Sequence, residues 1–281
     1  MKMRTRAENA QYVIDKLHWL GIAPSGRLTD MHSALNNGTV PYDENDPVFR
    51  AALEAERDLQ QLGFVFDHAG DRRNDPIFMK LMRDVVLDSV DPQNDKENSP
   101  GRDAQFNLLL AAVCQSARMF PVDYGEPDVT LKINGKLFGI AGKRIKSAKQ
   151  ARGHIKKAGH QIKREGMPGI IALEHSPAWN RDNKPIVSVL ESEAHVMLAR
   201  QRCTSFFDKH KKQINEVVAG CGVVGIVVFN FYVRHRSDRE WELAGVNLWF
   251  DTSDGDRQAK YYHDLLYRHF NSAMPNMAFM R

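Results

Sequence analysis

The sequence has few cysteines, and they stand far apart. Its 281 residues include three, Cys114, Cys203 and Cys221, and none belongs to a Cys-x-x-Cys pair. This spacing argues against a disulfide framework and against a cysteine-ligated zinc site. We therefore expect free thiols and a reducing, cytoplasmic environment.

Long hydrophobic runs are also lacking. No apolar stretch approaches the roughly 18 residues that a membrane span needs, so we expect no membrane partner. The N-terminal stretch MKMRTRAENAQYV is basic but has no apolar centre, which argues against a secretory signal.

Acidic residues are missing from one long segment. Residues 129–164 contain no Asp or Glu, although they contain eleven Lys and Arg residues. Uncompensated positive charge of this kind creates a strong local field, and nucleic acid is its natural partner. The alternative is a solvated basic helix face. The eleven are Lys132, Lys136, Lys143, Arg144, Lys146, Lys149, Arg152, Lys156, Lys157, Lys163 and Arg164.

Hydrophobic periodicity divides the chain into two regions. Residues 1–98 form a predicted helical region, with apolar residues at helical spacing in three segments. A polar, proline-containing stretch at 91–101 reads as a linker, so we place a second domain at 99–281. The three predicted helices span 7–20, 47–62 and 76–90.

After the linker, helical and strand patterns alternate. The order is α, β, β, α, β, α, β, β, α, which predicts an α/β fold with a mixed sheet flanked by helices. Asn134-Gly135 separates the first two strands and is a strong hairpin signal. The predicted helices span 101–120, 147–165, 192–218 (one long helix or a broken pair) and 256–270, and the predicted strands span 129–133, 137–143, 169–175, 223–233 and 241–250.

The first hairpin carries a candidate catalytic pair. Asp128 follows a proline at the start of one strand, and Lys143 closes the apolar run of the next. Residues 141 and 143 share a strand face, so an acid at 141 would complete a site for a hard cation such as Mg²⁺. That position is alanine, and we expect Ala141 to face a cleft open to solvent. The carbonyl of Gly142 is a further candidate ligand.

These features resemble the PD-(D/E)xK nuclease superfamily, which has the restriction-endonuclease-like fold. Pro127-Asp128 matches its PD element, and Ala141-Gly142-Lys143 occupies its (D/E)xK element with alanine in the acidic position. Asn107 stands where many members carry a helical glutamate. The basic helix after the motif, with Gln161 near its end, and the strand GIIALEH that follows are also similar to the family's crossover. The resemblance covers roughly residues 101 to 250.

The resemblance implies a metal-dependent DNA endonuclease that uses Mg²⁺ or Mn²⁺. Asp128 and the Gly142 carbonyl would bind the metal, and Lys143 would assist the attack on the phosphodiester. Cutting both strands implies a homodimer on double-stranded DNA, and family members of this kind often serve defence against foreign DNA. Residues 1–98 lie outside the resemblance and would be the part that binds a protein partner if the chain is instead a non-catalytic module. The expected phosphate contacts are Arg144, Lys146, Lys149, Lys156 and Lys157.

Ala141 leaves three explanations open. It is a substitution that disables an enzyme, or it is natural and a carboxylate from elsewhere replaces it, or the domain has lost catalysis. Candidate replacements are Glu126, Glu174 and Asp103. In the third case the chain is an inactive nucleic-acid-binding or assembly module. We expect the nearby histidines, His154 and His160, to face solvent instead of forming a metal cluster.

Overall fold

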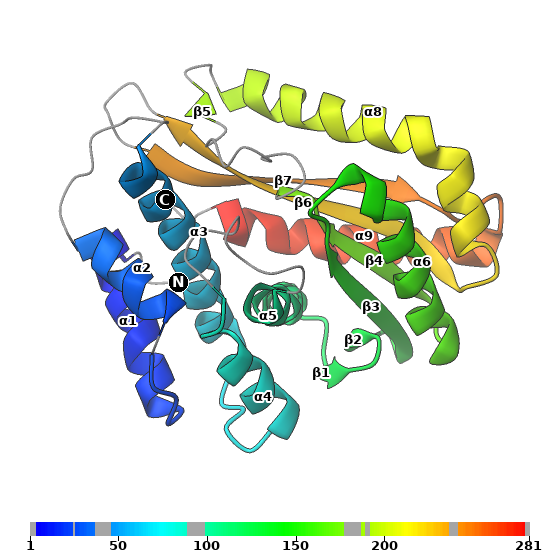
Figure 1. Ribbon diagram of the computed structural model, residues 1–281. Coiled ribbons are helices and arrows are strands. Elements are labelled where there is room, and N and C mark those ends of the chain that lie inside the picture. Colours follow the sequence, from blue (N-terminus) through cyan, green and yellow to red (C-terminus); the bar gives the residue numbers. More distant parts are fainter. Residues whose placement is uncertain are drawn as a thin grey trace.

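The computed structural model describes residues 4–24, 26–36, 46–88, 99–176, 187–188, 192–235 and 241–278. A mixed sheet of seven strands forms its centre, with helices on both faces (Figure 1). The prediction of an α/β fold with a mixed sheet flanked by helices is therefore confirmed. No helix within these ranges combines the length and the apolar character needed to cross a bilayer.

The helical region is built on local capping signals. Asp46 and Asp75 each precede a proline, and their carboxylates accept hydrogen bonds from the backbone N–H groups of Val48 and Ile77. These contacts satisfy amides that lack a partner in the first turn of a helix. The prediction missed α2. The helices are α1 (Arg6–Trp19), α2 (Arg27–Asn36), α3 (Pro47–His68) and α4 (Pro76–Asp84).

The remaining elements follow the predicted order, with the short strands β1 and β5 added. Helix α8 is one continuous helix over the predicted range. The elements are α5 (Pro100–Ser116), β1 (Val122–Gly125), β2 (Asp128–Ile133), β3 (Lys136–Arg144), α6 (Ala148–Arg164), β4 (Gly169–Glu174), β5 (Val187–Ser188), α8 (Ser192–Val218), β6 (Val223–His235), β7 (Trp241–Asp251) and α9 (Arg257–Ala278).

The sheet combines an antiparallel and a parallel half. Strands β1, β2 and β3 pair antiparallel, whereas β3, β4 and β6 run parallel. Strand β5 pairs with the far end of β6, and β7 pairs antiparallel with β6. Asn134 and Gly135 have φ angles of 50° and 80°, as a two-residue type I′ turn requires, so the predicted hairpin between β2 and β3 is present.

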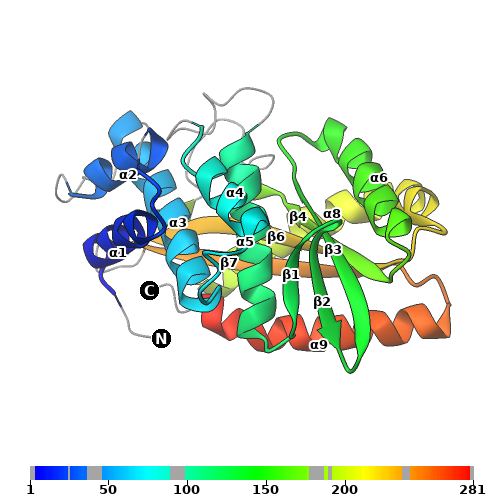
Figure 2. The ribbon, with the colours of Figure 1, turned by 90° about the horizontal axis from the view of Figure 1, so that it is seen from below.

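Two buried clusters cover the two faces of the sheet. Helices α5 and α9 pack on one face, and α6 and α8 pack on the other (Figures 1 and 2). Alternation along β3 sends Ile140 to the first face and Ala141 to the second. The first cluster also contains Leu17 and Leu62, so the N-terminal helices share a core with α5. The predicted domain boundary at 98/99 falls at the edge of residues 89–98, outside the described residues.

Candidate functional site

The hairpin between β2 and β3 brings Asp128 and Lys143 together. The Oδ2 atom of Asp128 accepts a hydrogen bond from Lys143 Nζ at 3.0 Å and another from the Gly142 N–H at 2.9 Å. Because Val129 pairs with Ile140, the same register places Asp128 opposite residue 141. The pair lies at the carboxyl end of β3, the edge where open α/β sheets usually bind ligands.

The backbone of Asp128 is strained. Its φ angle of 111° lies in a region that non-glycine residues rarely adopt. Its carboxylate is held by both the Gly142 amide and the Lys143 ammonium, and these contacts help to keep the residue there. A strained, well-held acid at the edge of a sheet is a reasonable candidate for function.

The site is mostly shielded from solvent, because the side chains of Asp128 and Lys143 are only 18% and 19% exposed. Burial raises the pKa of Asp128 above its usual value, although Lys143 and the Gly142 amide oppose this shift. The ionised carboxylate is therefore destabilised by folding.

We predict that Asp128→Asn stabilises the protein at neutral pH. A carboxyl group with a raised folded pKa favours folding below its unfolded pKa and loses that contribution as pH rises through the folded pKa. The variant should gain less than about 2 kcal/mol at pH 7, within the range typical of stabilising substitutions. Urea denaturation at pH 7 and pH 4 measures the gain, which should shrink at the lower pH. A loss of stability at pH 7 would contradict this account of the site.

Ala141 does not face an open cleft, so that expectation is wrong. The residue is 0% exposed and belongs to the cluster that includes Ala151, Ile155 and Ala158 of α6. Helix α6 therefore covers the position of the expected acid. A longer side chain at 141 would have to displace part of this contact.

Gly142 lies against α5 on the other face of the sheet. A Cβ atom built at this position would stand 2.7 Å from Asn107 Oδ1 and 2.9 Å from Leu110 Cδ1, which is too close for any other residue without movement. Asn107, at the position of the expected helical glutamate, thus packs on β3 from the face opposite Ala141. The role of the Gly142 carbonyl as a metal ligand stays a prediction.

Arg144 is buried, which removes it from the surface where we expected phosphate contacts. Its side chain is 3% exposed, its Nε atom pairs with Glu174, and its Nη1 atom lies 3.8 Å from Asp103. Glu126 in turn pairs with Arg164 at 2.7 Å. All three carboxylates proposed as substitutes for the missing acid are therefore engaged with arginines.

Arg144 and Glu174 belong to a larger network of buried charges that includes residues of α2 and α3. Arg27 is bound to Asp58 at 2.7 Å, and Arg57 also donates to Asp58. Burial would lower the pKa of Arg57, but the charges of Glu54, Asp58 and Glu174 raise it above its usual value. The network thus reaches from α2 and α3 to the end of β4. Sequence reading missed it because its members are scattered between residues 27 and 174.

The exposed side of α6 is basic. Lys149, Lys156 and Lys157 are exposed, whereas Lys146 is partly buried. Ile155 and its neighbours on the opposite side of the helix pack on the sheet. The amphipathic helix therefore presents three of the expected phosphate contacts on one element, beside the Asp128–Lys143 hairpin.

His154 is half-buried, so it faces solvent only in part. Burial lowers the pKa of His154, and the nearby charges of Lys157 and Lys143 lower it further. The neutral form of the imidazole is therefore favoured, and the ring lies close enough to Lys143 for the two groups to interact electrostatically. Its spacing of three from Ala151 and four from Ala158, both buried, is the signal that could have placed it. His160 is exposed, as expected.

The residues present do not form a complete magnesium site. Within the described parts of the chain, no group of three or more His, Cys, Asp or Glu side chains could hold a metal ion. Asp128 is the one carboxylate bonded to Lys143 among those residues, and Ala141 offers no oxygen. The set is therefore short of the oxygen ligands that Mg²⁺ prefers.

Comparisons with known proteins return no relatives. No family model, curated protein or solved structure matches this chain.

Proposed function

We propose that this chain has a restriction-endonuclease-like core and belongs to the metal-dependent DNA endonucleases, with a site that is one carboxylate short. The observation that carries the proposal is the bonding of Asp128 Oδ2 to both Lys143 Nζ and the Gly142 N–H. An acid that can bind a metal ion and a lysine that can stabilise negative charge are groups that assist phosphodiester hydrolysis.

Each residue of the pair has a distinct role in this proposal. The Lys143 ammonium stabilises negative charge on the phosphate, because a fixed cation in a shielded site interacts more strongly than one in water. Asp128 supplies one oxygen ligand and holds the ammonium in place until substrate arrives. Since residue 141 supplies no second carboxylate, we expect this chain to bind DNA without cutting it efficiently.

A second candidate is a nucleic-acid-binding or assembly module without catalysis. The observation that favours it is the packing of Ala141 at 0% exposure beneath α6. Cleavage of supercoiled plasmid by this chain and by an Ala141→Glu variant, with and without Mg²⁺, separates the two candidates. We expect the variant to cut; a variant that binds DNA and never cuts it would favour the module.

Both candidates predict that DNA binding weakens steeply with salt, and that α6 causes part of this dependence. Each phosphate contact contributes about 0.9 to the slope of log affinity against log salt on B-DNA. Removing Lys149, Lys156 and Lys157 should therefore reduce the slope by about 2–3 and weaken binding to all sequences alike. Fluorescence anisotropy with duplex DNA at several salt concentrations measures the slope.

A charge-matched control tests whether α6 itself binds DNA. It replaces three lysines outside the basic segment, Lys16, Lys80 and Lys260, by alanine and so makes the same change in net charge. This control should keep nearly the full slope. Equal slopes for the two triple variants would mean that only the overall charge of the protein matters.

A further inference from the structure

A pocket lies between α8 and β7, far from the Asp128–Lys143 pair in the sheet. Strands β3, β4 and β6 separate β7 from β2. Phe207, Ile214 and Phe250 form apolar walls, and the rings of Phe207 and Phe250 stack with centroids 3.8 Å apart. The pocket thus has a rigid aromatic side.

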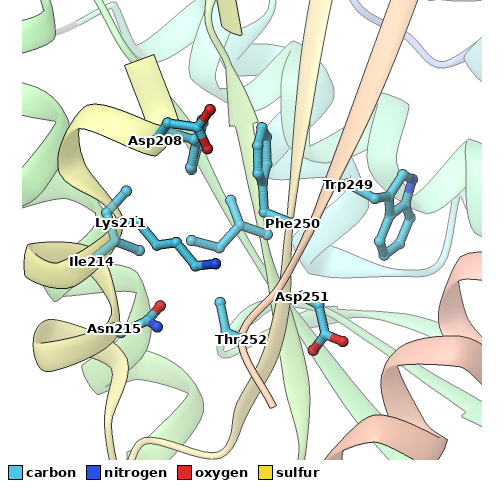
Figure 3. Close-up of a pocket in the computed structure, with 10 residues that line it drawn as sticks. Asp208, Lys211, Ile214, Asn215, Trp249, Phe250, Asp251 and Thr252 are labelled. Atoms are coloured by element: carbon cyan, nitrogen blue, oxygen red, sulfur yellow. The ribbon is translucent and has the colours of Figure 1, made fainter. Parts of the chain in front are cut away.

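Polar side chains of α8 line the other side of the pocket. Asp208, Lys211 and Asn215 follow one another along the helix at spacings of three and four, so they share one face. In Figure 3 the Lys211 side chain extends from α8 into the space below Phe250, and Asn215 lies beside it. Among the described residues, none forms an ion pair or hydrogen bond with the Lys211 ammonium or the Asn215 amide.

The acids near the pocket in the described part of the chain do not pair with the Lys211 ammonium, so it is available to a ligand. Asp251, which also lines the pocket, is bound by Lys260 at 2.8 Å and by the Ser253 N–H, and it therefore has its own partners. In Figure 3 Asp208, Lys211 and Asn215 lie on the same side of Phe250, with Asp208 at the other end of this row from Asn215. The pocket therefore offers two donors and a carboxylate acceptor along one face of α8, beside the aromatic wall.

The size of the pocket limits the ligand. Its volume is about 220 Å³. This is below the roughly 300–1,000 Å³ typical of pockets for drug-sized molecules. One flat ring system fits inside, and larger substituents would extend into the open mouth, where Asp208 and Lys211 are exposed.

We propose that this pocket binds a nucleoside monophosphate. The base lies inside, against the apolar wall of Ile214 and Phe250. At the mouth the phosphate accepts hydrogen bonds from Lys211 and Asn215, and Asp208 accepts from a ribose hydroxyl, a common partner of carboxylates in nucleotide sites. A free nucleotide and the 5′-phosphorylated end of a strand carry the same chemistry. The site is independent of the activity proposed for Asp128 and Lys143.

Isothermal titration calorimetry on the full chain tests the site with AMP, adenosine and inorganic phosphate at one salt concentration. AMP should bind at least tenfold more tightly than either fragment, because only AMP engages both the aromatic wall and the cation. Lys211→Met should reduce AMP binding at least tenfold and leave adenosine binding unchanged. Lys212→Met is the matched control, since this neighbouring lysine does not line the pocket, and it should bind AMP like the parent.

Comparing AMP with a 5′-phosphorylated oligonucleotide distinguishes a free nucleotide from a strand end as the ligand: the one that binds more tightly is the better ligand. Lys211→Met should weaken the binding of that ligand in either case. Three results would overturn the proposal: no binding of AMP or of the oligonucleotide, phosphate binding as tightly as AMP, or equal losses in Lys211→Met and Lys212→Met. Thermal unfolding of each variant confirms that the proteins compared are folded.

Discussion

Ala141→Glu should turn a protein that binds DNA without cutting it into one that nicks supercoiled plasmid in Mg²⁺ or Mn²⁺. Residue 141 lies opposite Asp128 and on the same strand face as Lys143. A glutamate there adds a second carboxylate to the one that Lys143 already holds. Two carboxylates and a backbone carbonyl are donors of the type that hard cations prefer.

The burial of residue 141 gives the variant a second measurable property. Placing a carboxylate beneath α6 costs several kcal/mol unless the charge is compensated. We therefore expect Ala141→Glu to be less stable than the parent without metal. Mg²⁺ at roughly 100 times its Kd should return about 2.7 kcal/mol, because it binds the folded state alone. The stability of the parent protein should change little when Mg²⁺ is added.

Two further variants complete the test. Ala141→Gln has nearly the same shape as the glutamate variant but no charge, so it should be destabilised without gaining cleavage or a response to metal. Adding Asp128→Asn to Ala141→Glu should abolish cleavage. The nuclease proposal fails if Ala141→Glu folds, binds DNA and shows neither cleavage nor stabilisation by metal. If the parent already cuts, a carboxylate outside this pair supplies the missing ligand.

Local signals in the sequence predicted most of the fold. The predicted helix starts at 47 and 76 are those of α3 and α4, and Asn134-Gly135 marked the hairpin that joins β2 and β3. The two shortest strands and the ten-residue helix α2 were missed. Strand β5 has two residues and β1 has four, which is too few for alternation to be recognised.

The candidate site was also predictable from the sequence only in part. The contact between Asp128 and Lys143 was predictable, because one hairpin of known register joins them. The burial of Arg144 was not, because it depends on Glu174, thirty residues later, and on helices that pack from the N-terminal region. From the sequence alone, a basic residue in a basic segment is interpreted as a phosphate contact, because its acidic partner is not known.

The buried charge network predicts the largest effect on stability, at Asp58. This carboxylate is 2% exposed and accepts hydrogen bonds from Arg27, which is 0% exposed, and from Arg57. Arg102 Nε lies 3.4 Å away. Removing the charge of one partner leaves buried cations without compensation, which typically costs about 3–5 kcal/mol. Asp58→Asn should therefore lower the free energy of unfolding at pH 7 by about that amount.

The pH dependence gives this prediction a signature that mere loss of packing would not produce. Burial alone would raise the pKa of Asp58, but Arg57, Arg102 and Arg27 together hold it far below its usual value. A depressed folded pKa contributes stability that is present above the unfolded pKa and is lost as pH falls through the folded pKa. The difference in the free energy of unfolding between the parent and Asp58→Asn should therefore be full at pH 7 and smaller at pH 3.

Urea denaturation at both pH values measures this difference. The control is Asp30→Asn at an exposed position, which should change stability by less than about 0.5 kcal/mol. A cost at Asp58 no larger than at Asp30, or one that does not change with pH, would mean that these charges do not stabilise the junction between the N-terminal helices and the strands that carry Lys143.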